Sequence, residues 1–403
     1  MAKSGDVDGP QQALDVPVTA GEPSPWRPLH IVMVGQKGLP ATYGGVEHHV
    51  EEIGQRLAER GHRVTVYNRE SYGPLPPVPY RGMDVKLAPT IASKHLDAIV
   101  HSATSTALAL RHGCDIIHYH ALGPGLVAPL PRYASRTGVV LTVHGLDHQR
   151  GKWGGVAQSV LSLAYWMSAR VPQETIVVSQ ALADRYRDER GRSVDYIPNG
   201  VALPAPVPAD VLAELGVRAR EYLLFVGRMV PEKAPAELLR AYRDVDSSLQ
   251  LVLVGGSSFT DEYTRQVQEL ADADPRVVFL GYIHGDRLQA LYQHARAFVL
   301  PSLLEGLPLT LLEAVSSAVP VVASDIAPNV EVLGEAGPCH VFFEAGNWDS
   351  LRGCLAATAG AEPPTADELQ RFRDGILQQY NWDHVTDLLE QVYLRAAKRQ
   401  KAT

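Results

Sequence analysis

The segment Pro301-Ser-Leu-Leu-Glu-Gly-Leu-Pro-Leu-Thr-Leu-Leu-Glu-Ala314 contains a Gly/Pro turn followed by an apolar run with helical character. Pro308 suits the first position of that helix, because the N–H group that proline lacks is unsatisfied there in any residue. The backbone N–H groups of Gly306, Leu307 and Leu309 would then face an anion at the helix N-terminus. The segment therefore predicts a loop and helix that bind an anionic group.

Two glutamates of this segment flank the predicted anion site. Glu305 lies in the turn and Glu313 lies a turn and a half into the helix. Such a pair can hold a phosphate ester that carries hydroxyl-rich groups, which is the arrangement that a nucleotide-sugar site needs. The alternative is a turn residue and a solvated helix residue that share a spacing by chance. An apolar run follows Glu313, however, and a buried acid without a partner is costly.

Composition excludes several classes of protein. A chain of 403 residues indicates two domains. The net charge of −8 argues against a general nucleic-acid binder, which needs a basic face. The three cysteines show neither paired nor metal-ligand spacing, so we expect a reducing, cytoplasmic compartment. The N-terminus lacks the apolar region of a signal peptide, and a membrane-spanning stretch is not expected.

The order of apolar segments predicts two doubly wound α/β domains. Residues 1–27 are rich in Pro, Gly and Asp and are expected to be a disordered tail. Short apolar strands alternate with helical stretches over 28–200, and the pattern restarts over 218–380 after a proline-rich linker at 201–217. A last helix is expected at 381–398. Buried strands are expected near 29–35, 64–67, 115–118, 139–143, 175–178, 222–226, 251–254, 277–280, 297–300 and 319–323. Ligands in such folds bind at the carboxyl ends of strands.

Cations and glycines follow the first strand of each predicted domain. Arg228 and Lys233 lie in a turn before a helix and suit a diphosphate, although such a turn can also be an ordinary solvated surface. Gly44 and Gly45, after the acceptor-side candidate Tyr43, lie in the corresponding loop of the first domain, where backbone can approach a ligand closely. That loop lacks the G-x-G-x-x-G fingerprint, which disfavours a nicotinamide or flavin site.

Three histidines lie at the ends of predicted strands. His144 is favoured for a donor-sugar or catalytic contact, and His120 is an acceptor-side candidate. His118 is expected to be a structural residue that faces the opposite way from His120. A metal site is not expected, because no carboxylate or cysteine set with ligand spacing accompanies the histidines.

Basic and aromatic residues precede a long apolar stretch in the first domain. Arg150 and Lys152 lie in Gln149-Arg-Gly-Lys-Trp153, before an apolar stretch at 156–171. This pattern is compatible with peripheral contact at a membrane surface. It favours, however, an acceptor-site loop, with Arg150 and Lys152 as candidates, followed by a core helix.

Several of these motifs together resemble retaining glycosyltransferases of family four, which have the GT-B fold. They are Gly227-Arg228 with Glu232-Lys233, the pair of glutamates in 305–313, and Tyr196-Ile-Pro-Asn-Gly-Val201. The segments Tyr43-Gly-Gly-Val-Glu-His and Thr142-Val-His-Gly-Leu-Asp resemble the rhamnosyltransferase-like branch. The resemblance covers residues 28–398, and Ala234 departs from the glycine that often follows the lysine.

The resemblance implies a role for each candidate residue. Arg228 and Lys233 would hold the donor diphosphate, Glu313 the ribose, and Glu305 and His144 the donor sugar. Further donor contacts would come from Gly44, Gly45, Tyr282, Gly306 and Leu307. It also implies metal-independent transfer of a sugar from a nucleoside-diphosphate sugar to a glycan, lipid-linked or small-molecule acceptor, without a cofactor. Two alternatives stay open: another GT-B enzyme, such as a nucleotide-sugar epimerase or hydrolase, and a non-catalytic nucleotide-sugar-binding scaffold.

Overall fold

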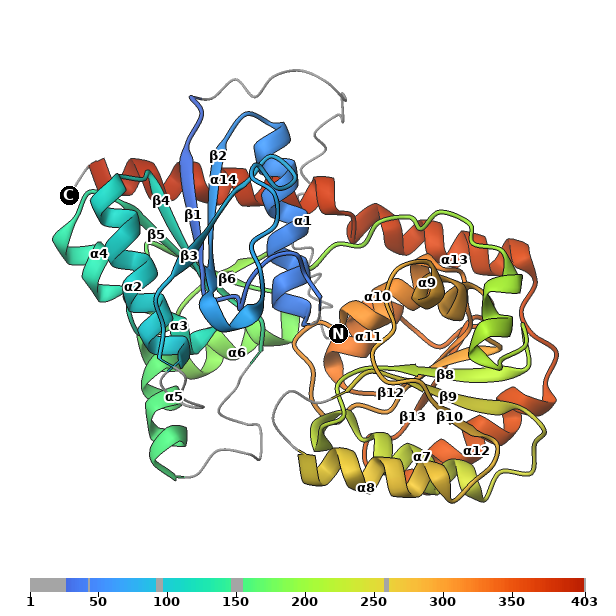
Figure 1. Cartoon of the computed structure of the whole chain (residues 1–403). Helices are drawn as coiled ribbons and strands as arrows, with labels where there is room; N and C mark the ends of the chain where they lie inside the picture. The colour runs from blue at the N-terminus through green and yellow to red at the C-terminus, as the bar shows by residue number, and fades with distance from the viewer. Residues whose placement is uncertain (1–26, 43, 92–96, 146–154, 257–260, 402–403) are drawn as a thin grey trace, which may run out of the picture.

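The computed structural model describes residues 27–401 except for 43, 92–96, 146–154 and 257–260, and it consists of two α/β units (Figure 1). The expected tail falls almost wholly outside the described residues. The first unit holds a parallel sheet of strand order β3-β2-β1-β4-β5-β6-β7. Its strands are β1 (His30–Val34), β2 (Arg63–Arg69), β3 (Asp84–Ala88), β4 (Ile116–His120), β5 (Gly138–Val143), β6 (Glu174–Val177) and β7 (Asp195–Tyr196).

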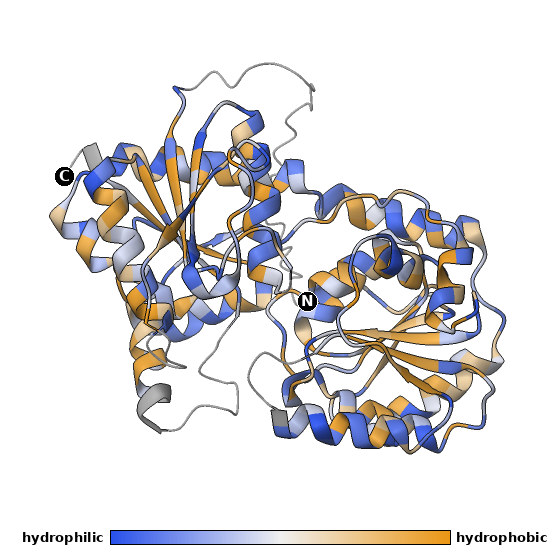
Figure 2. Cartoon of the chain, viewed as in Figure 1, coloured by the Kyte–Doolittle hydropathy of each residue, from blue (hydrophilic) through white to orange (hydrophobic). Residues whose placement is uncertain are grey.

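The second unit holds a parallel sheet of strand order β10-β9-β8-β11-β12-β13. Its strands are β8 (Tyr222–Val226), β9 (Gln250–Val254), β10 (Val277–Phe279), β11 (Ala297–Leu300), β12 (Val321–Ser324) and β13 (His340–Phe343). The central strands of both sheets are apolar (Figure 2) and buried, whereas the edge strands β3 and β10 are partly exposed. The prediction of a GT-B architecture with two doubly wound domains is therefore confirmed.

Helices pack around both sheets (Figure 1). Those of the first unit are α1 (Gly45–Glu59), α2 (Asp97–His112), α3 (Leu122–Gly125), α4 (Pro129–Ala134), α5 (Gly155–Ser168) and α6 (Gln180–Arg190). Those of the second unit are α7 (Pro235–Arg243), α8 (Asp261–Asp272), α9 (Asp286–Gln293), α10 (Leu309–Ser316), α11 (Ala327–Leu333), α12 (Trp348–Gly360) and α13 (Ala366–Gln379). The expected linker contains a short 3₁₀ segment, Ala209–Leu215.

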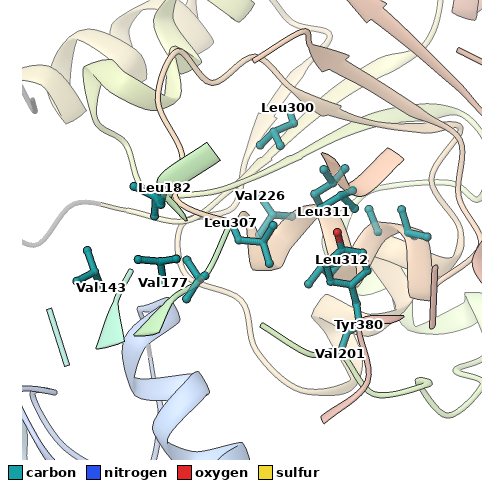
Figure 3. Packing of buried hydrophobic residues seen from close by; sticks show 14 of the residues in the cluster. Val143, Val177, Leu182, Val201, Val226, Leu300, Leu307, Leu311, Leu312 and Tyr380 are labelled. Atoms are coloured by element: carbon teal, nitrogen blue, oxygen red, sulfur yellow. The ribbon is translucent and has the colours of Figure 1, made fainter. Parts of the chain in front are cut away.

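The last helix, α14 (Trp382–Lys401), returns to the first unit and packs against β5 and α1. A Cβ atom on Gly138, at the start of β5, would lie 3.2 Å from the backbone of Ala396, so helix and strand are closely packed. The predicted crossing of the final helix is thus observed. Figure 3 shows that one apolar cluster continues between the units, from Val143 and Val177 to Leu307 and Leu311.

Each sheet has a switch point, where the strand order reverses. β1 pairs in parallel with both β2 and β4. The strands that follow β1 in sequence, β2 and β3, lie on one side of it, and β4 to β7 lie on the other. β8 pairs in the same way with β9 and β11. Ligands of such sheets bind beyond the carboxyl ends of these strands. We therefore expect the ligand site at the loops that follow β1, β4, β8 and β11.

Candidate functional site

Two helix N-termini from different domains approach each other at these loops. A Cβ atom on Gly45, at the start of α1, would lie 3.2 Å from Leu309 Cδ1, at the start of α10. A Cβ atom on Gly306 would lie only 1.9 Å from the carbonyl oxygen of His144, so only glycine fits there. The loop after β11 therefore lies directly against the end of β5. Helix N-termini carry free N–H groups and partial positive charge, which favour an anion between the domains.

Pro308 is the N-cap of α10, in an extended conformation, rather than the first helical residue. The prediction for this residue was wrong by one position. Its carbonyl oxygen accepts hydrogen bonds from the N–H groups of Leu311 and Leu312, as an N-cap carbonyl does. The helix still begins immediately after the glycine-containing turn, so its N-terminus stays at the boundary between the domains.

The two predicted cations of the second domain each have a carboxylate neighbour. Lys233 Nζ forms an ion pair with Glu305 Oε1, and only 14% and 8% of the two side chains are exposed. Arg228 lies 3.5 Å from Glu232 and is more accessible. The sequence did not predict the ion pair, because 72 residues separate its partners. Ala234, where the motif departs from glycine, has a left-handed backbone (φ 52°), which costs alanine about 1 kcal/mol.

Glu313 has the hydrogen-bond partner that its apolar surroundings require. The hydroxyl of Tyr292 donates to Glu313 Oε2 at 2.9 Å. Burial raises the pKa of the Glu313 carboxyl, while the neighbouring His48 of α1 and the Tyr292 hydrogen bond oppose that rise. Because His48 belongs to the first domain, Glu313 also lies at the boundary between the domains. A half-buried carboxylate of this kind suits hydroxyl groups of a bound ligand.

Four histidines of the first domain form a cluster: His49, His118 and His120 are buried, and His144 is partly buried. His120 Nδ1 lies 3.2 Å from His144 Nε2, and the His49 and His144 ring centroids are 4.8 Å apart. The expectation that His118 and His120 face opposite ways was wrong, and their ring centroids are 4.1 Å apart. Residues two apart in a strand point to the same face, because successive side chains alternate. His118 is satisfied internally, since Tyr393 and Thr142 hydrogen-bond to its two ring nitrogens.

Burial keeps the cluster neutral. It lowers the pKa of His49 to about 4 and the pKa values of His118, His120 and His144 well below the usual range. His120 Nε2 is buried without a hydrogen-bond partner, so this polar atom suits a ligand group. Ring nitrogens of His49, His120 and His144 lie within 4.8 Å of one another, a separation that a metal ion could bridge. One pair of these rings is already hydrogen-bonded, however, and metal independence stays a prediction.

The structure adds three residues that the sequence reasoning missed. Lys37, in the loop after β1, lies near Arg228 of the other domain, and burial lowers the pKa of its ammonium group. Asn199, noted in the sequence only as part of the 196–201 motif, hydrogen-bonds to His49 and to the Leu307 carbonyl oxygen. Tyr292 is the partner of Glu313. A lysine in a glycine loop was a visible signal, whereas the other two contacts depend on tertiary packing.

The remaining predicted residues divide into two groups. Tyr282 follows β10, is 45% exposed and stacks on His284, with ring centroids 6.2 Å apart. Gly256 lies under it, since a Cβ atom there would be 2.6 Å from the Tyr282 ring. The acceptor-side candidates Tyr43, Arg150 and Lys152 lie outside the described residues. The roles of all these residues stay predictions.

Two family models match consecutive parts of the chain. Residues 43–203 match "Glycosyltransferase Family 4" and residues 214–357 match "Glycosyl transferases group 1". The two matched regions correspond to the two α/β domains, and together they span most of the chain.

Curated relatives are similar over nearly the whole chain. An alpha-maltose-1-phosphate synthase of Mycolicibacterium smegmatis is 26% identical over 92% of this chain and 100% of its own length. A D-inositol 3-phosphate glycosyltransferase of Mycolicibacterium paratuberculosis is 28% identical over 92% of this chain and 89% of its own length.

Solved structures share the fold. Sucrose-phosphate synthase of Thermosynechococcus elongatus has a TM-score of 0.77 at 20% identity and covers 91% of this chain and 98% of its own. Anabaena HepE, in complex with UDP and glucose, has a TM-score of 0.75 at 19% identity and covers 90% of this chain and 99% of its own. The matched family models, the relatives and the GT-B architecture agree, and the chain belongs to the glycosyltransferases of the group 1 and family 4 type.

Proposed function

We propose that this glycosyltransferase moves a sugar from a nucleoside-diphosphate sugar to an acceptor hydroxyl with retention of anomeric configuration. One observation carries the proposal. The N-termini of α1 and α10 meet between the domains, with Arg228, Lys233 and two glutamates of the second domain at the same place. Positive groups there suit a diphosphate, and the glutamates suit the hydroxyl groups on either side of it.

This arrangement is proposed to stabilise the leaving diphosphate in the transition state. Negative charge develops on it as the bond to the sugar breaks, and Arg228, Lys233 and the start of α10 are fixed near that position before the reaction begins. Preorganised positive groups of this kind stabilise a transition state more than they stabilise the ground state. Glu313 is proposed to hold the ribose. His144 and Glu305 are proposed to contact the sugar.

Retention is proposed because the motifs of this chain resemble those of retaining glycosyltransferases. Glu305 is paired with Lys233, so it is not placed as a separate nucleophile. We propose attack by the acceptor on the face that the diphosphate leaves, with the phosphate accepting the acceptor proton. Product analysis by NMR tests this, because the anomeric proton reports the configuration directly. A retained configuration in the presence of excess EDTA is expected. An inverted product, or turnover restored only by a divalent metal, would contradict the proposal.

The acceptor is proposed to be a glycan, a lipid-linked molecule or a small molecule. Two relatives support a small phosphorylated acceptor, since one is named for inositol 3-phosphate and another for a sugar 1-phosphate product. Incubating the protein with the donor in the absence of an acceptor distinguishes the alternative activities. A nucleotide-sugar epimerase would change the donor sugar and a hydrolase would release it, whereas a transferase needs the acceptor for turnover.

We also propose that the enzyme works in the cytoplasm, at the inner face of the membrane. Among the described residues, every helix is too short or too polar to span a bilayer. Helix α5, however, exposes Val160, Leu163 and Trp166 along one face, and Arg170 lies over the Trp166 ring at 4.6 Å. An apolar face that ends in a Trp–Arg pair suits the headgroup region of a membrane.

Co-sedimentation with vesicles of acidic phospholipids tests the contact of α5. The wild-type protein should sediment with the vesicles, and Leu163→Ser with Trp166→Ser should reduce the bound fraction. Leu203→Ser is a matched control, because Leu203 is also exposed but lies in the linker. Equal binding by all three proteins would argue against α5 as the contact surface.

A further inference from the structure

The side chain of Asn199 connects the two domains. Oδ1 of Asn199 lies 3.0 Å from Nδ1 of His49 in α1, and Nδ2 of Asn199 donates to the carbonyl oxygen of Leu307 at 3.2 Å. Only 4% of Asn199 and 3% of His49 are exposed, so water does not substitute for either bond. One amide group therefore joins the histidine cluster of the first domain to the loop before α10 in the second.

The backbone around Asn199 is held in place on both sides. The N–H group of Ile197 donates to Val177 of β6, and the N–H group of Val201 donates to the carbonyl oxygen of Tyr380. A Cβ atom on Gly200 would lie 2.6 Å from the backbone nitrogen of Trp382, so that glycine is packed against the start of α14. The amide is thus presented from a fixed point where the linker begins and α14 returns.

These contacts determine the tautomer of His49. The carbonyl oxygen of Leu307 can only accept a hydrogen bond, so the NH₂ group of Asn199 must face it. The amide oxygen of Asn199 then faces His49, and Nδ1 of His49 must carry the proton. Nε2 is left as the acceptor atom of the ring. His48, His120, His144 and Trp382 surround this ring.

Leu307 is the residue through which this contact reaches the donor side. It follows Gly306, which lies against the His144 carbonyl, and Glu305, which is paired with Lys233. If the domains separate, Asn199 loses the Leu307 carbonyl and its amide can rotate by a half turn. The rotated amide would present NH₂ to His49 and favour the other tautomer. Domain closure and the orientation of the His49 proton are therefore coupled through one side chain.

We propose that Asn199 is a positioning residue that fixes His49 as the Nδ1–H tautomer only when the donor loop of the second domain is docked. The proposal extends the proposed transferase function, because His49 packs against His144, which is proposed to contact the donor sugar. It names a residue that acts through His49 and the Gly306–Leu307 loop. It also explains why two buried polar side chains 150 positions apart in the chain are paired with each other.

NMR of protein with ¹⁵N-labelled histidine tests the tautomer without any substrate. Long-range proton–nitrogen correlations distinguish Nδ1–H from Nε2–H, and His49→Gln assigns the signal. The wild-type protein at pH 8 should show Nδ1–H for His49, and Asn199→Ala should shift the ring toward Nε2–H. Asn68→Asp is the matched control, since Asn68 is also buried and paired with the backbone of Leu39. It should lower Tm and leave the His49 signal unchanged.

Kinetics test the coupling. Asn199→Asp keeps an acceptor for His49 but cannot donate to Leu307, whereas Asn199→Ala loses both bonds. Both variants should lose at least tenfold in kcat, with nucleoside-diphosphate affinity within threefold of wild type. Asn199→Ala combined with His49→Gln should be no slower than His49→Gln alone. An Nε2–H tautomer in the wild-type protein, or additive losses in the double variant, would overturn the proposal. The NMR result stands even if the protein proves not to transfer sugars.

Discussion

At the scale of the residue, Glu305 and Glu313 both lie near the start of α10 but have different partners. Glu305 is paired with Lys233 and has 8% of its side chain exposed, while Glu313 accepts from Tyr292 one and a half turns into the helix. Glu305 is nearer the proposed sugar position, where positive charge develops as the bond to the diphosphate breaks. A carboxylate whose contacts strengthen at that moment lowers the barrier more than it lowers the energy of binding.

This difference predicts separate effects of two conservative substitutions. Glu305→Gln should lower kcat by about 10²-fold or more with little change in nucleoside-diphosphate affinity, the pattern of an interaction made in the transition state. Glu313→Gln should mainly weaken nucleotide binding. Steady-state kinetics and calorimetric titration of both variants separate the roles. Normal kcat in the Glu305→Gln enzyme would show that this division is wrong.

At the scale of the element, the site depends on how closely α10 approaches the end of β5. Gly306→Ala would place a methyl group 1.9 Å from the His144 carbonyl oxygen, so the loop before α10 must move away. We expect at least a tenfold loss of kcat/KM, because a small displacement of a bound substrate is costly. Gly375→Ala in α13 is the matched control, since its Cβ meets no atom within 4 Å. It should leave activity unchanged and be neutral or slightly stabilising.

The sequence predicted elements that have a strong local signal and missed those without one. The buried strands of both sheets are continuous apolar runs and were found close to their observed bounds. β3, β7 and β13 were not anticipated. β7 has only two residues, and β3 includes charged Asp84 and Lys86, so neither presents an apolar run. The position of Pro308 differs by one residue because local sequence does not separate N-cap from first helical residue.

The strength of the local sequence signal also explains which features of the site were predicted and which were missed. Gly306, Arg228 and Lys233 lie in short motifs whose residue types point to phosphate chemistry by themselves. The Lys233–Glu305 ion pair and the contact of Asn199 with His49 join positions far apart in the chain. These contacts depend on how distant segments pack within each domain, which no local pattern reports. The relation of His118 to His120 was available from the strand period but was interpreted incorrectly.

At the scale of the whole molecule, the buried histidine cluster links folding to pH. Burial lowers the pKa of His49 to about 4, whereas an unfolded histidine titrates near ~6.5. Between these values the unfolded chain binds more protons than the folded protein, so the free energy of unfolding falls as pH decreases. From pH 7 to pH 5, His49 alone should cost about 1–2 kcal/mol of stability. His118, His120 and His144 act in the same direction.

Urea unfolding at pH 7, 6 and 5 measures this dependence. His49→Gln should reduce the slope by about one proton in this interval. His112→Gln is the control, because His112 is exposed and lies outside the buried cluster. Stability that rises on acidification from pH 7 to pH 5 would contradict the neutral cluster.

A thermal-shift titration with a panel of nucleoside diphosphates and their sugar conjugates tests the central claim, a donor site between the domains. A ligand that binds only the folded protein stabilises it by RT ln(1 + [L]/Kd), about 2.7 kcal/mol at a hundredfold excess over Kd. At least one nucleoside diphosphate of the panel should raise the Tm of the wild-type protein, and Lys233→Ala should abolish most of that shift. Arg240→Ala, at an exposed ion pair on α7, should preserve it. A panel that leaves Tm unchanged, or a shift that survives Lys233→Ala, would contradict the account.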